Sequence, residues 1–217
     1  MRIKICCIQS PEEAELALQL GAHALGLVSE MPTGNGVIHD DTIRQIVACV
    51  PPTYSTVLLT SRDDASAVVE HQRSTGVTTL QLVGSIDPDG ISQVREAIPG
   101  IQLIKVIHVT DSSSIQLAAD YFESADALLL DTSIQSVEGT ALGGTGVPHD
   151  WTVSREIVSK SSLPVFLAGG LTPENVDEAV RRVRPFGVDV CSGLRPNGTL
   201  DRELTKEFVA RATRAAV

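Results

Sequence analysis

Residues 55–82, STVLLTSRDDASAVVEHQRSTGVTTLQL, contain two short apolar segments separated by a longer amphipathic one. The two ends, Ser55–Leu59 and Thr79–Leu82, are short and largely apolar runs. Such runs are typical of strands that are buried on both faces of a parallel sheet. Between them, Asp64–Arg73 has the apolar spacing of a helix. The stretch therefore predicts a strand, a crossover helix and a second strand parallel to the first.

The same unit repeats along the whole chain. The predicted strands are Ile3–Cys7, Ala24–Val28, Ser55–Leu59, Thr79–Leu82, Gln102–Val109, Ala127–Asp131, Pro164–Ala168 and Gly187–Cys191. The predicted helices are Pro11–Leu20, Asp40–Cys49, Asp64–Arg73, Ile91–Ala97, Ser113–Phe122, Thr152–Lys160, Pro173–Arg182 and Arg202–Ala215. Eight strand–helix units in 217 residues predict an α/β fold, a closed (β/α)8 TIM barrel that forms a single domain over residues 1–217. The alternative is an open doubly wound sheet, which the lack of a G-x-G-x-x-G motif after the first strand makes less attractive as a dinucleotide-binding fold.

Local signals set several boundaries. Ser10-Pro11 and Thr172-Pro173 each supply an N-cap residue followed by a proline at the first helical position. Gly21 is placed to end the first helix. The polar stretch Thr132–Ala141 is predicted to be a loop after the sixth strand, on the face where such barrels carry their active sites.

Composition limits the partners. Hydrophobic residues make up 42% of the chain and aromatic residues only 3%, so aliphatic side chains must fill the core. The net charge is −10, and the only basic cluster is the short Arg181–Arg184 inside a predicted helix. This balance argues against a nucleic acid or an anionic membrane as partner. An anionic small molecule would have to be bound locally, by backbone N–H groups.

The cysteines and the chain start favour a reduced cytoplasm. Cys6 and Cys7 are adjacent and poorly placed to pair with each other, and with Cys49 and Cys191 they show no zinc-binding spacing. No apolar stretch approaches the ~18 residues of a membrane span. The segment Met1–Lys4 runs directly into a predicted strand, without the pattern of a signal peptide.

The carboxyl ends of the predicted strands are where chemistry is expected. Gly169-Gly170 follows the seventh strand and Ser192-Gly193 follows the eighth, which is where barrels of this kind hold phosphate. The alternative is that both are tight turns that need positive φ. Cys6 and Asp131 end the first and sixth strands and could serve as a base and an acid. The alternatives are a small buried apolar residue for Cys6 and a cap for Asp131.

Three further features have weaker support. Gly143-Gly144-Thr145-Gly146 could clamp the substrate, or could be a surface turn before Asp150 caps the next helix. His23 and His71 are predicted to lie at the surface, away from the strand ends. His108 could line the barrel mouth or be a structural histidine.

Together these motifs resemble phosphoribosylanthranilate isomerase, an enzyme family of tryptophan biosynthesis. The matching segments, in order, are Lys4-Ile5-Cys6, Gln81-Leu82-x-Gly84, Leu129–Thr132, Gly143–Trp151 with two positions free, Leu167–Val176 with one position free, Val183–Val190 with one position free, and Ser192-Gly193. They span nearly the whole chain, and the last third is the most specific part.

The resemblance implies an Amadori rearrangement of N-(5-phosphoribosyl)anthranilate to the 1-deoxyribulose phosphate. It implies that Asp131 is the general acid that protonates the furanose ring oxygen and that Cys6, as thiolate, removes the proton from C2. Partial burial would raise the pKa of Asp131 as this role requires. The resemblance implies no metal and no cofactor, a small sugar phosphate as the ligand, and a monomer or a homodimer. The residues expected to bind substrate or phosphate are Gly144, Thr145, Gly146, Gly169, Gly170, Ser192, Gly193 and Arg195.

This chain also departs from the family pattern. The family has glycine at Cys7, threonine at Gln9, histidine at Val83, serine at Cys191 and glutamate at Arg195. The loop Glu30–His39 contains no arginine or lysine, although the family usually places there the arginine that holds the anthranilate carboxylate. Because a buried carboxylate without a cation is costly, Arg195 is the candidate replacement.

Three functions are therefore compatible with the sequence. The first is an ordinary phosphoribosylanthranilate isomerase with a relocated carboxylate contact. The second is an isomerase of the same mechanism acting on a different sugar phosphate. The third is a non-catalytic phosphate-binding relative, which the presence of both Cys6 and Asp131 disfavours.

Overall fold

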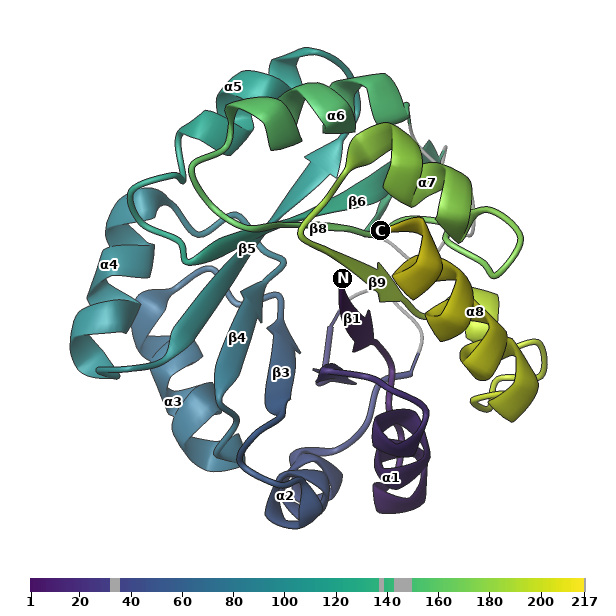
Figure 1. Ribbon diagram of the computed structural model, residues 1–217. Coiled ribbons are helices and arrows are strands. Elements are labelled where there is room, and N and C mark those ends of the chain that lie inside the picture. Colours follow the sequence, from purple (N-terminus) through teal and green to yellow (C-terminus); the bar gives the residue numbers. More distant parts are fainter. Residues whose placement is uncertain (32–35, 137–138, 143–149, 217) are drawn as a thin grey trace.

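In the computed structural model the chain forms a closed barrel of parallel strands surrounded by helices (Figure 1). The structure describes residues 1–31, 36–136, 139–142 and 150–216. The barrel strands are β1 (Arg2–Ile5), β2 (Ala24–Val28), β3 (Ser55–Thr60), β4 (Thr79–Leu82), β5 (Gln102–Val109), β6 (Ala127–Ser136), β8 (Val165–Leu167) and β9 (Gly187–Val190). The helices are α1 (Pro11–Gln19), α2 (Asp40–Cys49), α3 (Ala65–Thr75), α4 (Pro88–Ala97), α5 (Ser113–Ala119), α6 (Trp151–Lys160), α7 (Val176–Val183) and α8 (Arg202–Ala215), with a short 3-10 helix η1 (Ser192–Leu194) after β9.

The barrel closes because the last strand pairs with the first. β9 is parallel to β1, with Lys4 opposite Asp189 and Ile5 opposite Val190. The other barrel strands pair in chain order, and β6 pairs directly with β8. The predicted (β/α)8 barrel is therefore confirmed, and the open doubly wound sheet is excluded.

Each strand separates two buried layers. Ile3 and Ile5 of β1 belong to the larger layer, between the strands and the helices. Cys6 belongs to the smaller layer inside the barrel, together with residues such as Val57 and Leu129. Side chains that alternate along a strand point to opposite faces, so Lys4 and Cys6 face the interior while Ile3 and Ile5 face the helices. This alternation decides which strand residues can reach the active site.

One predicted loop is wrong. Residues 132–141 were expected to be irregular, but β6 continues to Ser136 and pairs with an additional antiparallel strand, β7 (Gly139–Leu142). Ser133 lies opposite Leu142 and Ser136 opposite Gly139. The polar composition of this segment led to the prediction of a loop. A polar segment can also form the strands of an antiparallel hairpin, because one face of such a hairpin can be exposed to water.

Two predicted helix starts are also wrong. α4 begins at Pro88 and not at Ile91, because Asp87 caps it by accepting from the N–H of Gly90. The Thr172-Pro173 signal does not open α7, which begins at Val176 with Asn175 as its N-cap residue. The Asn175 amide is instead used on the preceding turn: its Oδ1 accepts from the N–H of Thr172 and its Nδ2 donates to the carbonyl of Gly170. These two bonds fix the turn that carries Gly170.

Candidate active site

Two predicted catalytic side chains lie at the inner rim of the barrel. Cys6 follows β1, is buried at 5% exposure, and is a free thiol. Asp131 lies in β6, two residues after Leu129, which belongs to the interior layer. The alternation of the strand therefore turns Asp131 toward the interior as well. Its Oδ1 accepts a hydrogen bond of 2.8 Å from the N–H of Thr132.

Beneath these groups lies a buried ion pair that was not predicted. Lys4 Nζ donates to Asp189 Oδ1 at 2.9 Å, and the side chains are 1% and 8% exposed. Both residues lie inside the barrel, on adjacent strands and in direct register. The sequence did contain a signal for this ion pair, namely a lysine and an aspartate within otherwise apolar predicted strands. Such charged residues are rarely buried unless they are paired.

The four groups interact electrostatically. Burial raises the pKa of Asp131 to about 6, and the carboxylate of Asp189 adds to the rise while the Thr132 N–H and Lys4 oppose it. Burial also raises the pKa of Cys6 to about 11, against the opposing charge of Lys4. The rise at Asp131 suits a proton donor. The rise at Cys6 is opposite to what a base at neutral pH needs, so in the substrate-free protein Cys6 is mainly a thiol.

The glycine-containing turns after β8 and β9 lie against each other. Gly169 and Gly170 both have positive φ, 81° and 65°. A Cβ on Gly193 would lie 2.1 Å from the carbonyl oxygen of Leu171, so only glycine allows this contact. A Cβ on Gly169 would lie 2.2 Å from Thr132 Oγ1, which brings the end of β6 to the same place. The structure thus brings together the predicted phosphate-binding turns and the strand that carries Asp131.

Arg195 has a partner inside the protein. Its two terminal nitrogens donate to the two carboxylate oxygens of Glu13, at 3.0 and 2.8 Å, and its side chain is only 5% exposed. Glu13 also accepts from the N–H groups of Gln9 and Leu200. This network ties the turn after η1 to the start of α1. A contact between Arg195 and a substrate carboxylate would require this pair to open.

Cys7 and Cys191 form a disulfide with a Cα–Cα distance of 5.9 Å. Spacing along the chain does not reveal this pair, because 184 residues separate the two cysteines and only barrel closure brings them together. Cys7 has φ of 63°, a left-handed conformation that favours glycine. This explains why the resembling family has glycine there, and the bond to Cys191 holds the less suited cysteine in place.

The prediction for His71 is wrong. Its side chain is 2% exposed, and its ring nitrogens lie 3.3 Å from Thr60 Oγ1 and 3.0 Å from Ser29 Oγ. Ser29 Oγ in turn donates to Asp40 at 2.9 Å. This polar cluster links α3 and α2 to the ends of β2 and β3, and it anchors the loop in which the chain departs from the family pattern.

The structure describes some of the remaining predicted residues and not others. Ser192 begins η1 next to Gly193. His108 is half-buried on β5, and burial lowers the pKa of its imidazole. Asp150 caps α6 by accepting from the N–H of Thr152. Gly144, Thr145 and Gly146, with the rest of residues 143–149, lie outside the described residues.

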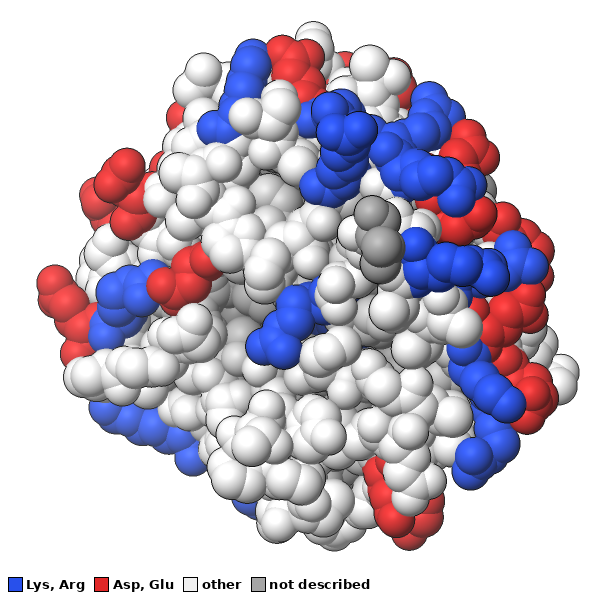
Figure 2. All heavy atoms as spheres, viewed as in Figure 1, with Lys and Arg blue, Asp and Glu red and all other residues white. Residues whose placement is uncertain are grey.

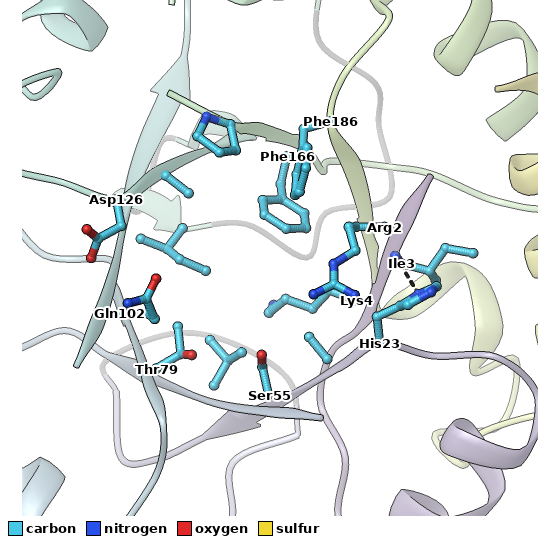
Figure 3. Close-up of a pocket in the computed structure, with 15 residues that line it drawn as sticks. Arg2, Ile3, Lys4, His23, Ser55, Thr79, Gln102, Asp126, Phe166 and Phe186 are labelled. Atoms are coloured by element: carbon cyan, nitrogen blue, oxygen red, sulfur yellow. Dashed lines mark hydrogen bonds between the residues drawn. The ribbon is translucent and has the colours of Figure 1, made fainter. Parts of the chain in front are cut away.

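A cavity of about 230 Å³ lies at the opposite end of the barrel (Figure 3). Arg2 and Lys4 reach into it from β1, and Phe166 and Phe186 form one wall as an edge-to-face pair at 5.5 Å. Residues at the amino ends of the strands line it, so it is not the site of Cys6 and Asp131. On the face that carries this cavity, charged residues lie mainly toward the rim and form no continuous basic patch (Figure 2).

The described residues contain neither a candidate membrane span nor a candidate metal site. No described helix is both long enough and apolar enough to cross a bilayer. Within the same parts of the chain, no three or more histidine, cysteine, aspartate or glutamate side chains are grouped as metal ligands would be.

Fold and site together define a class: a (β/α)8-barrel protein with a candidate acid–base site at the carboxyl ends of its strands. Residues 3–211 match the family model of N-(5'-phosphoribosyl)anthranilate isomerase. The chain therefore belongs to the phosphoribosylanthranilate isomerase family.

Individual relatives agree with this assignment. The N-(5'-phosphoribosyl)anthranilate isomerase of Methanocella arvoryzae is 40% identical over 209 residues, which is 96% of each chain. Isomerase 2 of Methanosarcina mazei is 42% identical over 214 residues, 98% of this chain and 94% of that one. A crystal structure of the Thermotoga maritima isomerase superposes with a TM-score of 0.85 at 29% identity and covers 99% of both chains.

Proposed function

We propose that this protein catalyses the Amadori rearrangement of N-(5-phosphoribosyl)anthranilate to 1-(2-carboxyphenylamino)-1-deoxyribulose 5-phosphate in tryptophan biosynthesis. The observation that carries the proposal is that Cys6 and Asp131 both interact with the buried Lys4–Asp189 pair inside the barrel. Family membership supports the choice of substrate. A related isomerase with a TM-score of 0.82 and 27% identity has been solved with the reduced form of this product.

In this mechanism Asp131 begins as the neutral acid. It donates its proton to the furanose ring oxygen while the bond between that oxygen and C1 breaks, and the nitrogen lone pair forms the C1–N double bond of a Schiff base. The raised pKa of Asp131, about 6, supports this role, because it keeps a fraction of the acid protonated near neutral pH.

Cys6 then acts as the base. As thiolate it removes the proton from C2, the electron pair forms the C1–C2 double bond, and the Schiff base becomes a neutral enolamine. Tautomerisation of the enolamine gives the ketone. The pKa of Cys6, about 11 without substrate, means that the reactive thiolate is a minor species whose stabilisation matters for the rate.

The turns after β8 and β9 would hold the phosphate. The N–H groups of Gly169 and Gly170 donate to no backbone oxygen among the described residues, which leaves them available to an anion. Glycine lets the backbone approach a ligand closely, and successive N–H groups form an anion-binding concavity. Ser192 and Gly193 would complete this cradle, and Gly144, Thr145 and Gly146 would contact the substrate from the segment after β7.

Arg195 is the candidate cation for the anthranilate carboxylate, provided that its guanidinium exchanges Glu13 for the substrate. The reaction needs no metal or cofactor. We place the protein in the cytoplasm as a monomer or homodimer that acts on a small molecule, without a nucleic-acid or membrane partner. The Cys7–Cys191 disulfide departs from the reduced thiols that are usual in that compartment.

The roles of Cys6 and Asp131 predict how their variants behave. Cys6→Ser and Asp131→Asn should each lower kcat by about 100-fold or more, the usual contribution of general acid–base catalysis. The assay follows the loss of phosphoribosylanthranilate fluorescence, and circular dichroism verifies that each variant is folded. Cys49→Ser is the matched control, since Cys49 is a free cysteine on α2 remote from the barrel interior. A folded Cys6→Ser enzyme as active as the unmodified protein would remove the mechanism.

A further inference from the structure

The Lys4–Asp189 pair lies where it can act on both proposed catalytic groups. Both side chains are inside the barrel, and Lys4 is two residues before Cys6 on the same face of β1. A Cβ placed on Gly26 of β2 would lie 2.6 Å from Cys6 Sγ and 3.0 Å from Lys4 Nζ. The ammonium and the thiol therefore share one small space, which exists because residue 26 has no side chain.

The charges that face Cys6 can be named. Among the described residues they are Lys4 on its own strand and Asp189 on β9, whereas β2 offers only Gly26. Asp131 on β6 interacts with the same Lys4–Asp189 pair. On its other side Lys4 borders the amino-end cavity, where Arg2 and His23 also lie. Of these groups, only Lys4 is a cation in contact with the thiol.

A buried ion pair of this kind is poorly explained by stability. Removing two charges from water costs several kcal/mol for each ion, and replacing such a pair with apolar residues of similar volume is often neutral or stabilising. The pair also lies next to the proposed acid and base, directly beneath them in the barrel interior. Its position favours a role in the reaction.

We propose that Lys4 and Asp189 are positioning residues that set opposite proton states on the two catalytic groups, the ammonium favouring the thiolate of Cys6 and the carboxylate favouring the protonated form of Asp131. This inference rests on the proposed function, because it assumes that Cys6 is the base and Asp131 the acid. Each charge also has an unfavourable effect: Asp189 disfavours the thiolate of Cys6, and Lys4 disfavours the protonated form of Asp131. The proposed role requires the favourable effect of each charge to be the larger one. The directions of the pKa shifts agree, since Lys4 lowers the pKa of Cys6 and Asp189 raises that of Asp131.

The test uses the double variant Lys4→Met/Asp189→Leu, which removes both charges without leaving either one buried and unpaired. All proteins carry Cys49→Ser, so that Cys6 is the only free thiol. The rate of alkylation of Cys6 by iodoacetamide is measured from about pH 7 to about pH 9, where it is proportional to the thiolate fraction. The same proteins are assayed for kcat and KM across this range and below it.

We expect the folded double variant to be alkylated about threefold more slowly at each pH, because losing Lys4, which lowers the pKa of Cys6, outweighs losing Asp189, which raises it. We expect kcat to fall at least about tenfold with a smaller change in KM, and the acidic limb of the kcat profile to move to lower pH as Asp131 loses the influence of Asp189. Lys105→Met is the matched control. Lys105 is also a buried lysine, but it faces Tyr121 and the carbonyl of Gly84 and should leave the alkylation of Cys6 unchanged.

A folded double variant with the alkylation rate and kcat of the parent protein would overturn the proposal. If the double variant does not fold, Asp189→Asn takes its place: it should move the acidic limb to lower pH without slowing alkylation, and an unmoved limb would overturn the proposal. The Cys6→Ser variant distinguishes failure of the proposed function from failure of the role proposed for the Lys4–Asp189 pair. If Cys6→Ser is inactive and the double variant is fully active, the role of the pair fails while the proposed function stands.

Discussion

At the residue scale, the burial that suits Asp131 to act as an acid lowers the stability of the protein above about pH 6. Its pKa is raised to about 6, so the folded protein binds this proton more tightly than the unfolded chain does. The stabilisation from Asp131 is therefore complete below the ordinary pKa near 3.8 and is lost as the pH rises through about 6. Above that pH the native protein carries a buried carboxylate that the mechanism needs as an acid.

Asp131→Asn should for this reason be more stable than the unmodified protein at pH 8, by about 3 kcal/mol, and nearly equal to it at pH 4. The amide does not ionise, so it avoids the cost of the buried charge. Urea unfolding at both pH values measures the difference. The control is Asp120→Asn, an exposed aspartate on α5's C-terminal side, which should show no such dependence. Equal stability of Asp131→Asn and the parent at pH 8 would contradict the assignment.

At the element scale, three cross-links join the first strand–helix unit to the last. The Lys4–Asp189 pair joins β1 to β9, and the disulfide Cys7–Cys191 joins the residues that follow these two strands. The Arg195–Glu13 pair joins the turn after η1 to α1. A closed barrel must bring its termini together, and these links do so at the place where the base and the proposed phosphate turns lie.

The double variant Cys7→Ser/Cys191→Ser should therefore unfold more easily. Cross-linking residues separated by 184 positions restricts the unfolded chain, which corresponds to about 5 kcal/mol at most in the loop-entropy account. A reductant should lower the Tm of the unmodified protein toward that of the variant and leave the variant unchanged. A Tm of the parent that does not respond to reductant would contradict a structural disulfide.

At the scale of the whole molecule, the local periodicity of apolar residues was sufficient to predict the barrel architecture. The predicted bounds of β2, β4, β5, α2 and α8 coincide with the observed ones. The errors occur where a polar or proline signal is ambiguous, as at the β6–β7 hairpin and at the start of α7. Cys6, Asp131 and the glycine turns were selected because barrels place chemistry at strand ends, and their roles stay predictions.

Contacts made only by closing the barrel could not be found in this way. His71 was assigned to the surface because helical position alone does not show that Ser29 and Thr60 lie opposite it. The pairing of Lys4 with Asp189, of Cys7 with Cys191 and of Arg195 with Glu13 each joins residues more than 180 positions apart. Sequence spacing carries no information on such neighbours unless the register of β1 and β9 is known.

We expect this barrel to isomerise N-(5-phosphoribosyl)anthranilate, although its loop after β2 contains no arginine or lysine. The most direct measurement is the fluorescence decay of that substrate with the purified protein, supported by growth rescue of a tryptophan auxotroph. We predict saturable turnover with kcat/KM of at least about 10⁴ M⁻¹s⁻¹, the lower range of ordinary enzymes. Decay no faster than without protein, and no rescue, would contradict the claim and favour a different sugar phosphate as the substrate.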